Sequence, residues 1–184
     1  MNEKKLLKEN LNNANTQTYG DQVFDKLLAE RIKLVIERAP MEKLMDATAE
    51  IARYELGAFE GAPIEYNLKS LPIVDALIDK YRERFRRTED DSMLAAVWFG
   101  AFIGKVLVNE FNGKWQQIPD SEWIANFRFG KIVIGSNLMI SPTVTILKSI
   151  DDDSYRVEDF VRSLQVLVNS KDLQEFIISQ NNNN

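Results

Sequence analysis

Residues 92–115 read SMLAAVWFGAFIGKVLVNEFNGKW, a segment that is apolar nearly all round and has small residues at a four-residue interval. Ala96, Gly100 and Gly104 therefore fall on one stripe of a helix. Because glycine inside a helix costs about 1 kcal/mol relative to alanine, two glycines one turn apart predict that another backbone or an aromatic ring packs against this stripe. We expect the helix to form the centre of the fold.

Three amphipathic helices are expected before this segment, because apolar residues recur there at helical spacing. They span residues 21–36, 41–56 and 72–85, and the first two should form a hairpin. The expected stop signals are Pro40 after the first helix, and Gly57 with the Gly61-Ala62-Pro63 turn after the second. The expected start signals are Pro72 for the third helix and an acidic cap at 89–92 for the central helix. On the third helix the spacing assigns Asp75, Asp79, Arg82 and Arg86 to the solvated face.

After Gly113 the period of the apolar residues changes from 3.6 to 2, which is typical of strands. Strands are expected at 115–118, 123–129 and 132–140, with a two-residue hairpin at Gly130-Lys131. Alternation places the aromatic residues of the middle strand on the core side. Helices are then expected at 142–150 and 157–168, with a break at 151–154 whose three aspartates, 151–153, form the turn and N-cap.

This order predicts an α+β domain in which N-terminal helices pack around the central glycine-containing helix, followed by a small antiparallel sheet and C-terminal helices. The chain has 184 residues and 45% hydrophobic content, enough for one domain with a buried core. We assign the domain to residues 20–180, with tails at 1–19 and 181–184, which are rich in Asn and other polar residues.

Composition excludes several classes of site. The sequence has no cysteine and no histidine, which removes thiolate and histidine metal sites, disulfides and the common catalytic triads. The net charge of -5 argues against a nucleic-acid partner, and the apolar run 93–104 is too short to span a membrane. We therefore expect a cytoplasmic protein with no metal and no cofactor.

Two segments partly resemble phosphate-binding and calcium-binding motifs but lack residues that those motifs require. The run from Gly100 to Lys105 is one residue short of a P-loop, and Val106 stands where that loop needs Ser or Thr. Residues 151–153 lack the glycine and the distal Glu of a calcium loop.

Three surface features are candidates for contacting a protein partner. They are an acidic stripe on the second helix, a basic turn at the end of the third, and the expected hairpin tips. Their residues are Glu42, Asp46 and Glu50; Arg84, Arg86 and Arg87; and Asp120 and Lys131. Each of them is also compatible with an ordinary solvated face.

The second half of the chain resembles an uncharacterised bacterial domain. The resemblance rests on Gly100-x-x-x-Gly104, on Gly113-Lys114-Trp115, on a hairpin and on a helix opened by Pro142, with Phe160 in the final stretch. The chain departs from the pattern twice. Lys105 stands where an acidic residue is expected after the glycine, and Asn112 stands where the pattern has the first of two glycines at the end of the helix. The resemblance implies a role like that of immunity proteins, which bind another protein.

The function that these observations favour is a non-enzymatic protein-binding module, most concretely an immunity or inhibitor protein that binds a cognate effector. One alternative is a small-molecule or nucleotide sensor with a pocket between the central helix and the sheet, lined by Phe99, Phe102, Trp115 and Phe127. Another is a hydrolase that uses carboxylates among Glu50, Asp75 and Asp79. If the glycine stripe were exposed, a homodimer would be expected.

Overall fold

A computed structural model describes residues 20–123, 127–135 and 138–170. Within these ranges the protein is an α+β domain with six α-helices and one three-stranded antiparallel sheet. In chain order the elements are α2 (Gly20–Ile36), α3 (Met41–Glu60), the 3-10 helix η1 (Leu68–Ser70), α4 (Leu71–Phe85), α5 (Glu89–Phe111), β1 (Lys114–Trp115), the 3-10 helix η2 (Phe127–Phe129), β2 (Ile132–Ile134), β3 (Leu138–Ile140), α7 (Pro142–Asp151) and α8 (Val157–Asn169).

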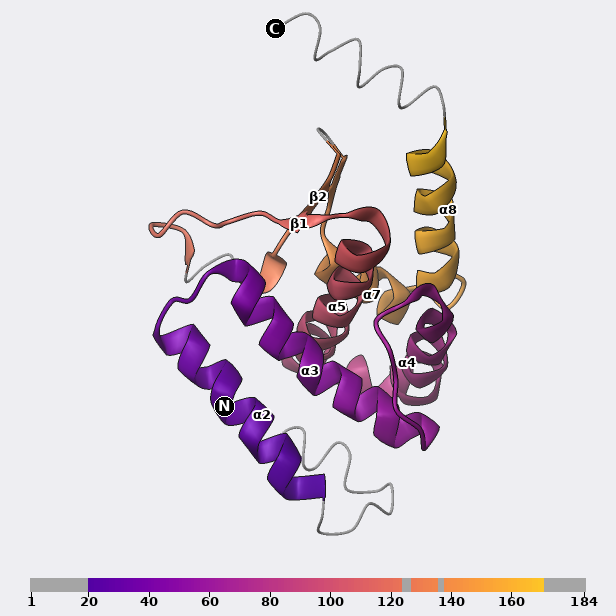
Figure 1. Ribbon diagram of the computed structural model, residues 1–184. Helices are drawn as coiled ribbons and strands as arrows, with labels where there is room; N and C mark the ends of the chain where they lie inside the picture. Colours follow the sequence, from indigo (N-terminus) through magenta and orange to yellow (C-terminus); the bar gives the residue numbers. More distant parts are fainter. Residues whose placement is uncertain (1–19, 124–126, 136–137, 171–184) are drawn as a thin grey trace, which may run out of the picture.

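The central position of α5 confirms the expectation from the sequence. It packs mainly against α3 on one side and α7 on the other. The α2–α3 hairpin covers one flank, α4 and α8 lie together on the opposite flank, and the sheet lies at one end of the helical body (Figure 1). This arrangement buries both long sides of α5, which explains why its sequence is apolar nearly all round.

The small residues of α5 are needed for two different close contacts. A Cβ atom on Gly100 would lie 2.8 Å from the backbone nitrogen of Thr143, so here α7 itself approaches the helix. A Cβ atom on Gly104 would lie 2.2 Å from Cζ2 of Trp115, so one turn later an indole ring fills the space. The predicted packing against a backbone or a ring is thus confirmed, and the stripe is internal.

The length and hydropathy of α5 are those of a membrane-spanning helix, but its environment is that of a core helix. Of its most apolar 18-residue window, 78% is buried inside the domain. The described residues therefore form a globular domain around one buried apolar helix.

The helix ends differ from the predicted ones in detail. Gly57 lies inside α3, which continues to Glu60 and ends where Gly61 adopts a left-handed conformation with φ of 76°. The N-cap of α5 is Thr88, whose hydroxyl accepts a hydrogen bond from the backbone N–H of Asp91, while the acidic residues occupy the first turn. At the other end Asn112, with φ of 52°, takes the left-handed position usually held by glycine.

The sheet is the part of the fold that the sequence predicted worst. β1 pairs with β2 and β2 with β3, so the range 132–140 contains two separate strands. The predicted hairpin at Gly130-Lys131 is wrong, and Phe127–Phe129 is a 3-10 helix rather than the end of a strand. The rest of that predicted strand includes 124–126, which lie outside the described residues.

Close packing, and not a turn, explains why position 130 holds a glycine. A Cβ atom there would lie 2.8 Å from Cε of Met45 and 3.0 Å from the ring of Trp115. The alternation rule still holds across the three real strands, because Trp115, Ile132 and Ile140 are cross-strand neighbours and are all buried.

The last two helices match their predicted ranges within a residue at each end. They lie side by side with α4, which reaches both of them and the turn that joins them (Figure 1). The tails predicted at 1–19 and 181–184 lie outside the described residues.

Candidate functional site

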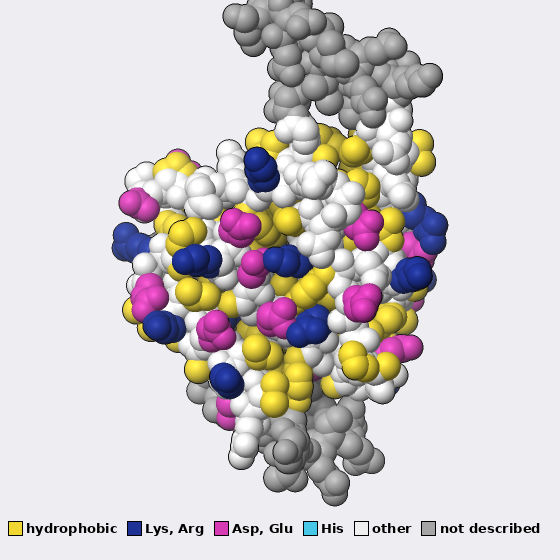
Figure 2. All heavy atoms as spheres, viewed as in Figure 1, with side chains coloured by type: hydrophobic (Ala, Val, Ile, Leu, Met, Phe, Trp, Pro, Cys, Tyr) yellow, Lys and Arg dark blue, Asp and Glu magenta, His cyan; other side chains and the backbone are white. Residues whose placement is uncertain are grey.

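The acidic stripe on α3 is largely engaged within the domain. The carboxylate of Asp46 accepts a hydrogen bond of 2.7 Å from Lys105 Nζ on α5, and Glu50 binds both Arg53 and the hydroxyl of Tyr66. Burial, with the hydrogen bond to Glu50, raises the pKa of Tyr66. Glu42 is exposed. On the face that carries α2 and α3, acidic and basic side chains are interspersed (Figure 2), so the stripe is part of a mixed surface.

The position of Lys105, which departs from the bacterial-domain pattern, has a local explanation in this chain. Its ammonium group joins the central helix to α3 through the ion pair with Asp46, and both side chains are partly buried. An acidic residue at position 105 would face Asp46 and repel it.

The basic turn divides into three different environments. Arg86 donates hydrogen bonds of 2.7 Å to the carbonyl oxygens of Ile150 and Asp151, so it is committed to the end of α7. Arg84 lines a pocket described below, where desolvation, with the nearby charge of Arg87, lowers the pKa of its guanidinium. Arg87 is exposed. The three arginines do not form one binding surface.

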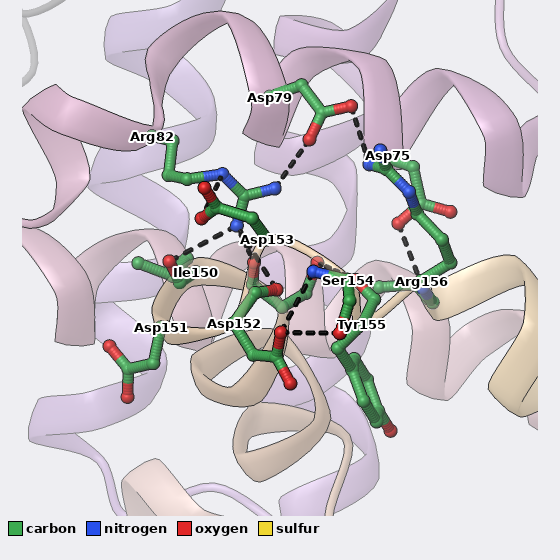
Figure 3. Close-up of polar contacts among 12 residues, drawn as sticks. Asp75, Asp79, Arg82, Ile150, Asp151, Asp152, Asp153, Ser154, Tyr155 and Arg156 are labelled. Carbon is green, nitrogen blue, oxygen red and sulfur yellow. Dashed lines mark hydrogen bonds and ion pairs between the residues drawn. The ribbon is translucent and has the colours of Figure 1, made fainter.

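A polar clasp between α4 and the α7–α8 turn uses several of the predicted residues (Figure 3). Asp75 accepts hydrogen bonds from the backbone N–H groups of Val157 at 2.9 Å and Glu158 at 3.0 Å, and thereby caps α8. Arg82 donates to the backbone carbonyls of Ser149 and Ile150 at the end of α7. One helix thus caps the carboxyl end of α7 and the amino end of α8.

This clasp corrects the assignment of Asp75 and Arg82 to a solvated face, because both are buried. It also corrects the predicted N-cap, because the cap of α8 comes from α4 across the fold and not from 151–154. Within that run Asp152 caps its own turn through the N–H and hydroxyl of Ser154, while Asp153 pairs with Arg86.

Two of the three carboxylates that the hydrolase alternative needs, Asp75 and Asp79, belong to the clasp. Burial raises the pKa of Asp75 in spite of its two amide hydrogen bonds. Asp79 is partly desolvated, but hydrogen bonds from Arg156 and Arg82 outweigh this effect and lower its pKa. Glu50 belongs to α3 and is held by Arg53 and Tyr66. Asp75 and Asp79 therefore bind groups around the start of α8, whereas Glu50 binds Arg53 and the segment after α3, so the three are not grouped around one reacting centre.

The space between α5 and the sheet, where a ligand pocket was expected, is filled by side chains. The indole of Trp115 lies against Gly104 and Gly130, and Ile132 lies beside it. Phe99, Phe102 and Trp115 are all buried core residues. The side chain of Phe127 lies outside the described part of the structure.

The predicted tip residues Asp120 and Lys131 are both exposed. Neither lies in a hairpin turn of the described sheet. Lys131 precedes β2, and its carbonyl accepts a hydrogen bond of 2.8 Å from the N–H of Gln116 after β1.

Three exposed apolar side chains lie on segments next to the N-terminal end of α7, because η2 contacts α7 and β3 leads directly into it. Phe129 in η2 is 37% exposed, Met139 in β3 is 51% exposed, and Val144 in the first turn of α7 is 39% exposed. The hydroxyl of Thr143 ties η2 to α7 by donating a 2.9 Å hydrogen bond to the carbonyl of Arg128. We call Phe129, Met139 and Val144 the α7 surface.

A small pocket lies between α3, α4 and α5, and a carboxyl group lines it. Its volume is about 40 Å³, and it is lined by Glu55, Leu77, Tyr81, Arg84, Phe85, Asp91, Leu94, Ala95, Trp98 and Phe99. Glu55 is 9% exposed, and desolvation raises its pKa to about 7. Among the described residues none donates a hydrogen bond to this carboxyl group or forms an ion pair with it.

Sequence reasoning missed both features, although a signal existed for one of them. Glu55 lies three residues after Ala52 and seven after Thr48, on the buried stripe of α3, so a charged residue on the apolar face could have been noticed. The α7 surface had no such signal, because its residues come from three separate elements.

No group of three or more acidic side chains that could hold a metal ion occurs in the described ranges. No family model, no curated protein and no solved structure matches this chain, so its resemblance to a bacterial domain stays a prediction.

Proposed function

We propose that this protein is a non-enzymatic protein-binding module that acts in the cytoplasm through the α7 surface. The observation that supports the proposal is the exposure of Phe129, Met139 and Val144 at one end of α7. Large apolar side chains that gather on a surface, in contrast to single scattered ones, are typical of protein contact sites.

The neighbouring sheet extends this surface. Val133 faces outward between its cross-strand neighbours Lys114 and Met139, because the alternate residues Ile132 and Ile134 face the core. Lys114, in β1, and Lys131, directly before β2, are both exposed. An apolar centre with a charged rim is the usual composition of a transient interface.

The most concrete form of this function is an immunity or inhibitor protein bound to a cognate effector. The protein's own charged groups are consistent with a binding role, since Asp46, Asp75 and Arg82 stabilise contacts between helices. A rigid scaffold of this kind presents a preformed surface, and a preformed surface loses little entropy on binding.

The test is capture of partners with the tagged full-length chain and with matched surface variants. We expect Met139→Glu and Val144→Glu to weaken binding of a specific partner by about ten-fold or more, because a buried apolar contact is replaced by a desolvated charge. Ile36→Glu is the control, since Ile36 is an apolar residue that is even more exposed but lies at the end of α2. All three variants should keep the circular dichroism spectrum of the parent.

A partner retained by both α7-surface variants would contradict the proposed site. The effector relation has its own readout: the captured partner should arrest growth when it is expressed alone, and co-expression with this chain should restore growth. A partner that is harmless alone would leave a binding module and remove the immunity role.

A further inference from the structure

We propose that the pocket between α3, α4 and α5 binds a primary ammonium group, with the carboxylate of Glu55 as its counter-ion. This site is separate from the α7 surface, because none of its lining residues belongs to η2, β3 or α7. The proposal therefore does not depend on the protein-binding role.

The geometry shows a largely buried carboxyl group that has no hydrogen-bond partner within the described ranges. Glu55 is 9% exposed and lines the pocket, and none of the described residues binds its carboxyl group. A buried polar group that lacks a protein partner usually binds water or a ligand. A volume of about 40 Å³ is sufficient for one water molecule or one ammonium-sized group, and too small for a nucleotide.

The charges around the pocket favour a cation. Its other titratable lining groups are Arg84 and Tyr81 from α4 and Asp91 from α5. Arg84 and Asp91 offset each other, so the pocket is neutral while Glu55 is protonated and has one excess negative charge once Glu55 ionises. A monovalent cation restores neutrality.

The remaining walls are also suited to an ammonium group. The rings of Tyr81, Phe85, Trp98 and Phe99 line the pocket. The face of an aromatic ring attracts a cation, and the attraction grows when water is excluded. Tyr81 already accepts such a contact on its surface, where Lys80 Nζ lies 5.3 Å from the ring centroid.

Binding exchanges a proton for the cation. At neutral pH the carboxylic acid of Glu55 releases its proton to solvent, and the resulting carboxylate binds the incoming ammonium ion, so the charge of the site does not change. Because desolvation raises the pKa of Glu55 to about 7, this release costs little near neutrality. Affinity should therefore rise with pH through this range and then level off.

The experiment is a titration of the ¹⁵N-labelled full-length chain with methylammonium chloride at about one pH unit above and below the pKa of Glu55. Sodium chloride at equal ionic strength is the blank, and methanol and sodium acetate are neutral and anionic probes of similar size. We expect saturable shifts at Trp98 with methylammonium, stronger at the higher pH, and none with acetate. A parallel titration with Nα-acetyl-lysine amide tests whether the pocket accepts a lysine side chain as well as a small free amine. Only a pocket that is open at its mouth admits the longer chain.

Two variants make the result decisive. Glu55→Gln should lower methylammonium affinity by about ten-fold or more and abolish its pH dependence, because a charge-assisted hydrogen bond is lost. Glu50→Gln, on the same helix but outside the pocket, should bind like the parent. Equal affinity of Glu55→Gln and parent, equal binding of methanol, binding of acetate, or no saturable shift in the parent would each overturn the proposal.

Discussion

Gly104 shows how one hydrogen atom in place of a methyl group determines the packing of a core. Trp115 occupies the volume that a side chain at position 104 would need, and Cδ1 of Ile132 is a further close neighbour. The cost of a helical glycine is therefore offset by contact with a large aromatic ring.

Replacing this glycine tests the contact by the sign of its effect. On a free helix surface Gly104→Ala would stabilise the protein by about 1 kcal/mol through helix propensity. Against Trp115 we expect destabilisation of about 1–3 kcal/mol from overpacking, measured by urea denaturation. Combining it with Trp115→Phe, which removes the atoms in conflict, should cost less than the sum of the two single changes. A stabilised Gly104→Ala variant would contradict the structure.

Glu55 is the residue whose ionisation should govern stability near neutral pH. Its pKa is raised in the folded state from its ordinary value of 4.5 to about 7 because burial disfavours the charged form. The folded state therefore holds the proton more tightly than the unfolded state, and the free energy of unfolding falls as pH rises from about 4.5 to about 7.

The size of this loss is on the order of 3 kcal/mol, from about two and a half pKa units at 1.36 kcal/mol each. Urea denaturation across this pH range should show the fall in the parent, and Glu55→Gln should remove most of it. Glu50→Gln serves as the control. A parent whose stability rises through this window would show that Glu55 is not the dominant group.

At the scale of elements, α4 acts as a connector for helices that are distant in sequence. Its side chains Asp75 and Arg82 bind backbone groups at the facing ends of α8 and α7. The N-cap residue of α8, Arg156, makes no side-chain capping hydrogen bond, so the amino end of α8 depends on Asp75 of α4.

Removing the cap should loosen α8 in particular. Asp75→Ala leaves the N–H groups of Val157 and Glu158 without their acceptor, and we expect a loss of about 1–3 kcal/mol. Hydrogen exchange of these two amides should accelerate more than that of α3. Asp159→Ala, at an exposed position of the same helix turn, should leave their exchange nearly unchanged. Equal protection in both variants would contradict the capping role.

At the scale of the whole molecule, the internal glycine stripe removes the reason for expecting a homodimer. Gly100 lies against α7 and Gly104 against Trp115, so α5 has no bare stripe left for a second copy. Dimerisation through any other surface would have to use the exposed apolar residues of the domain.

The isolated protein should therefore have the mass of a single chain in light scattering at micromolar concentration. If it has twice that mass and Met139→Glu restores the single-chain value, the α7 surface is a self-contact and the proposed protein partner is a second copy. Association that persists in this variant would indicate another surface.

The sequence alone predicted the α+β class, the central helix, the close packing on its glycines and all six described helices to within a few residues at each end. Helical spacing and the placement of proline and glycine are local signals, so neighbouring residues were enough to predict these elements. The strands were predicted less well, because β1 pairs with β2 across an intervening segment and pairing leaves little trace in so short a run.

Tertiary structure alone decided which polar residues are functional candidates and which hold the fold together. Asp75 and Asp79 resembled a catalytic pair and are helix-capping and ion-pairing groups, whereas Glu55 was overlooked and lines a pocket. The physical reason is that the energy of a charged side chain depends on the groups that surround it in space. Those groups come from helices far apart in the chain, whereas the periodicity of a helix depends only on its own residues.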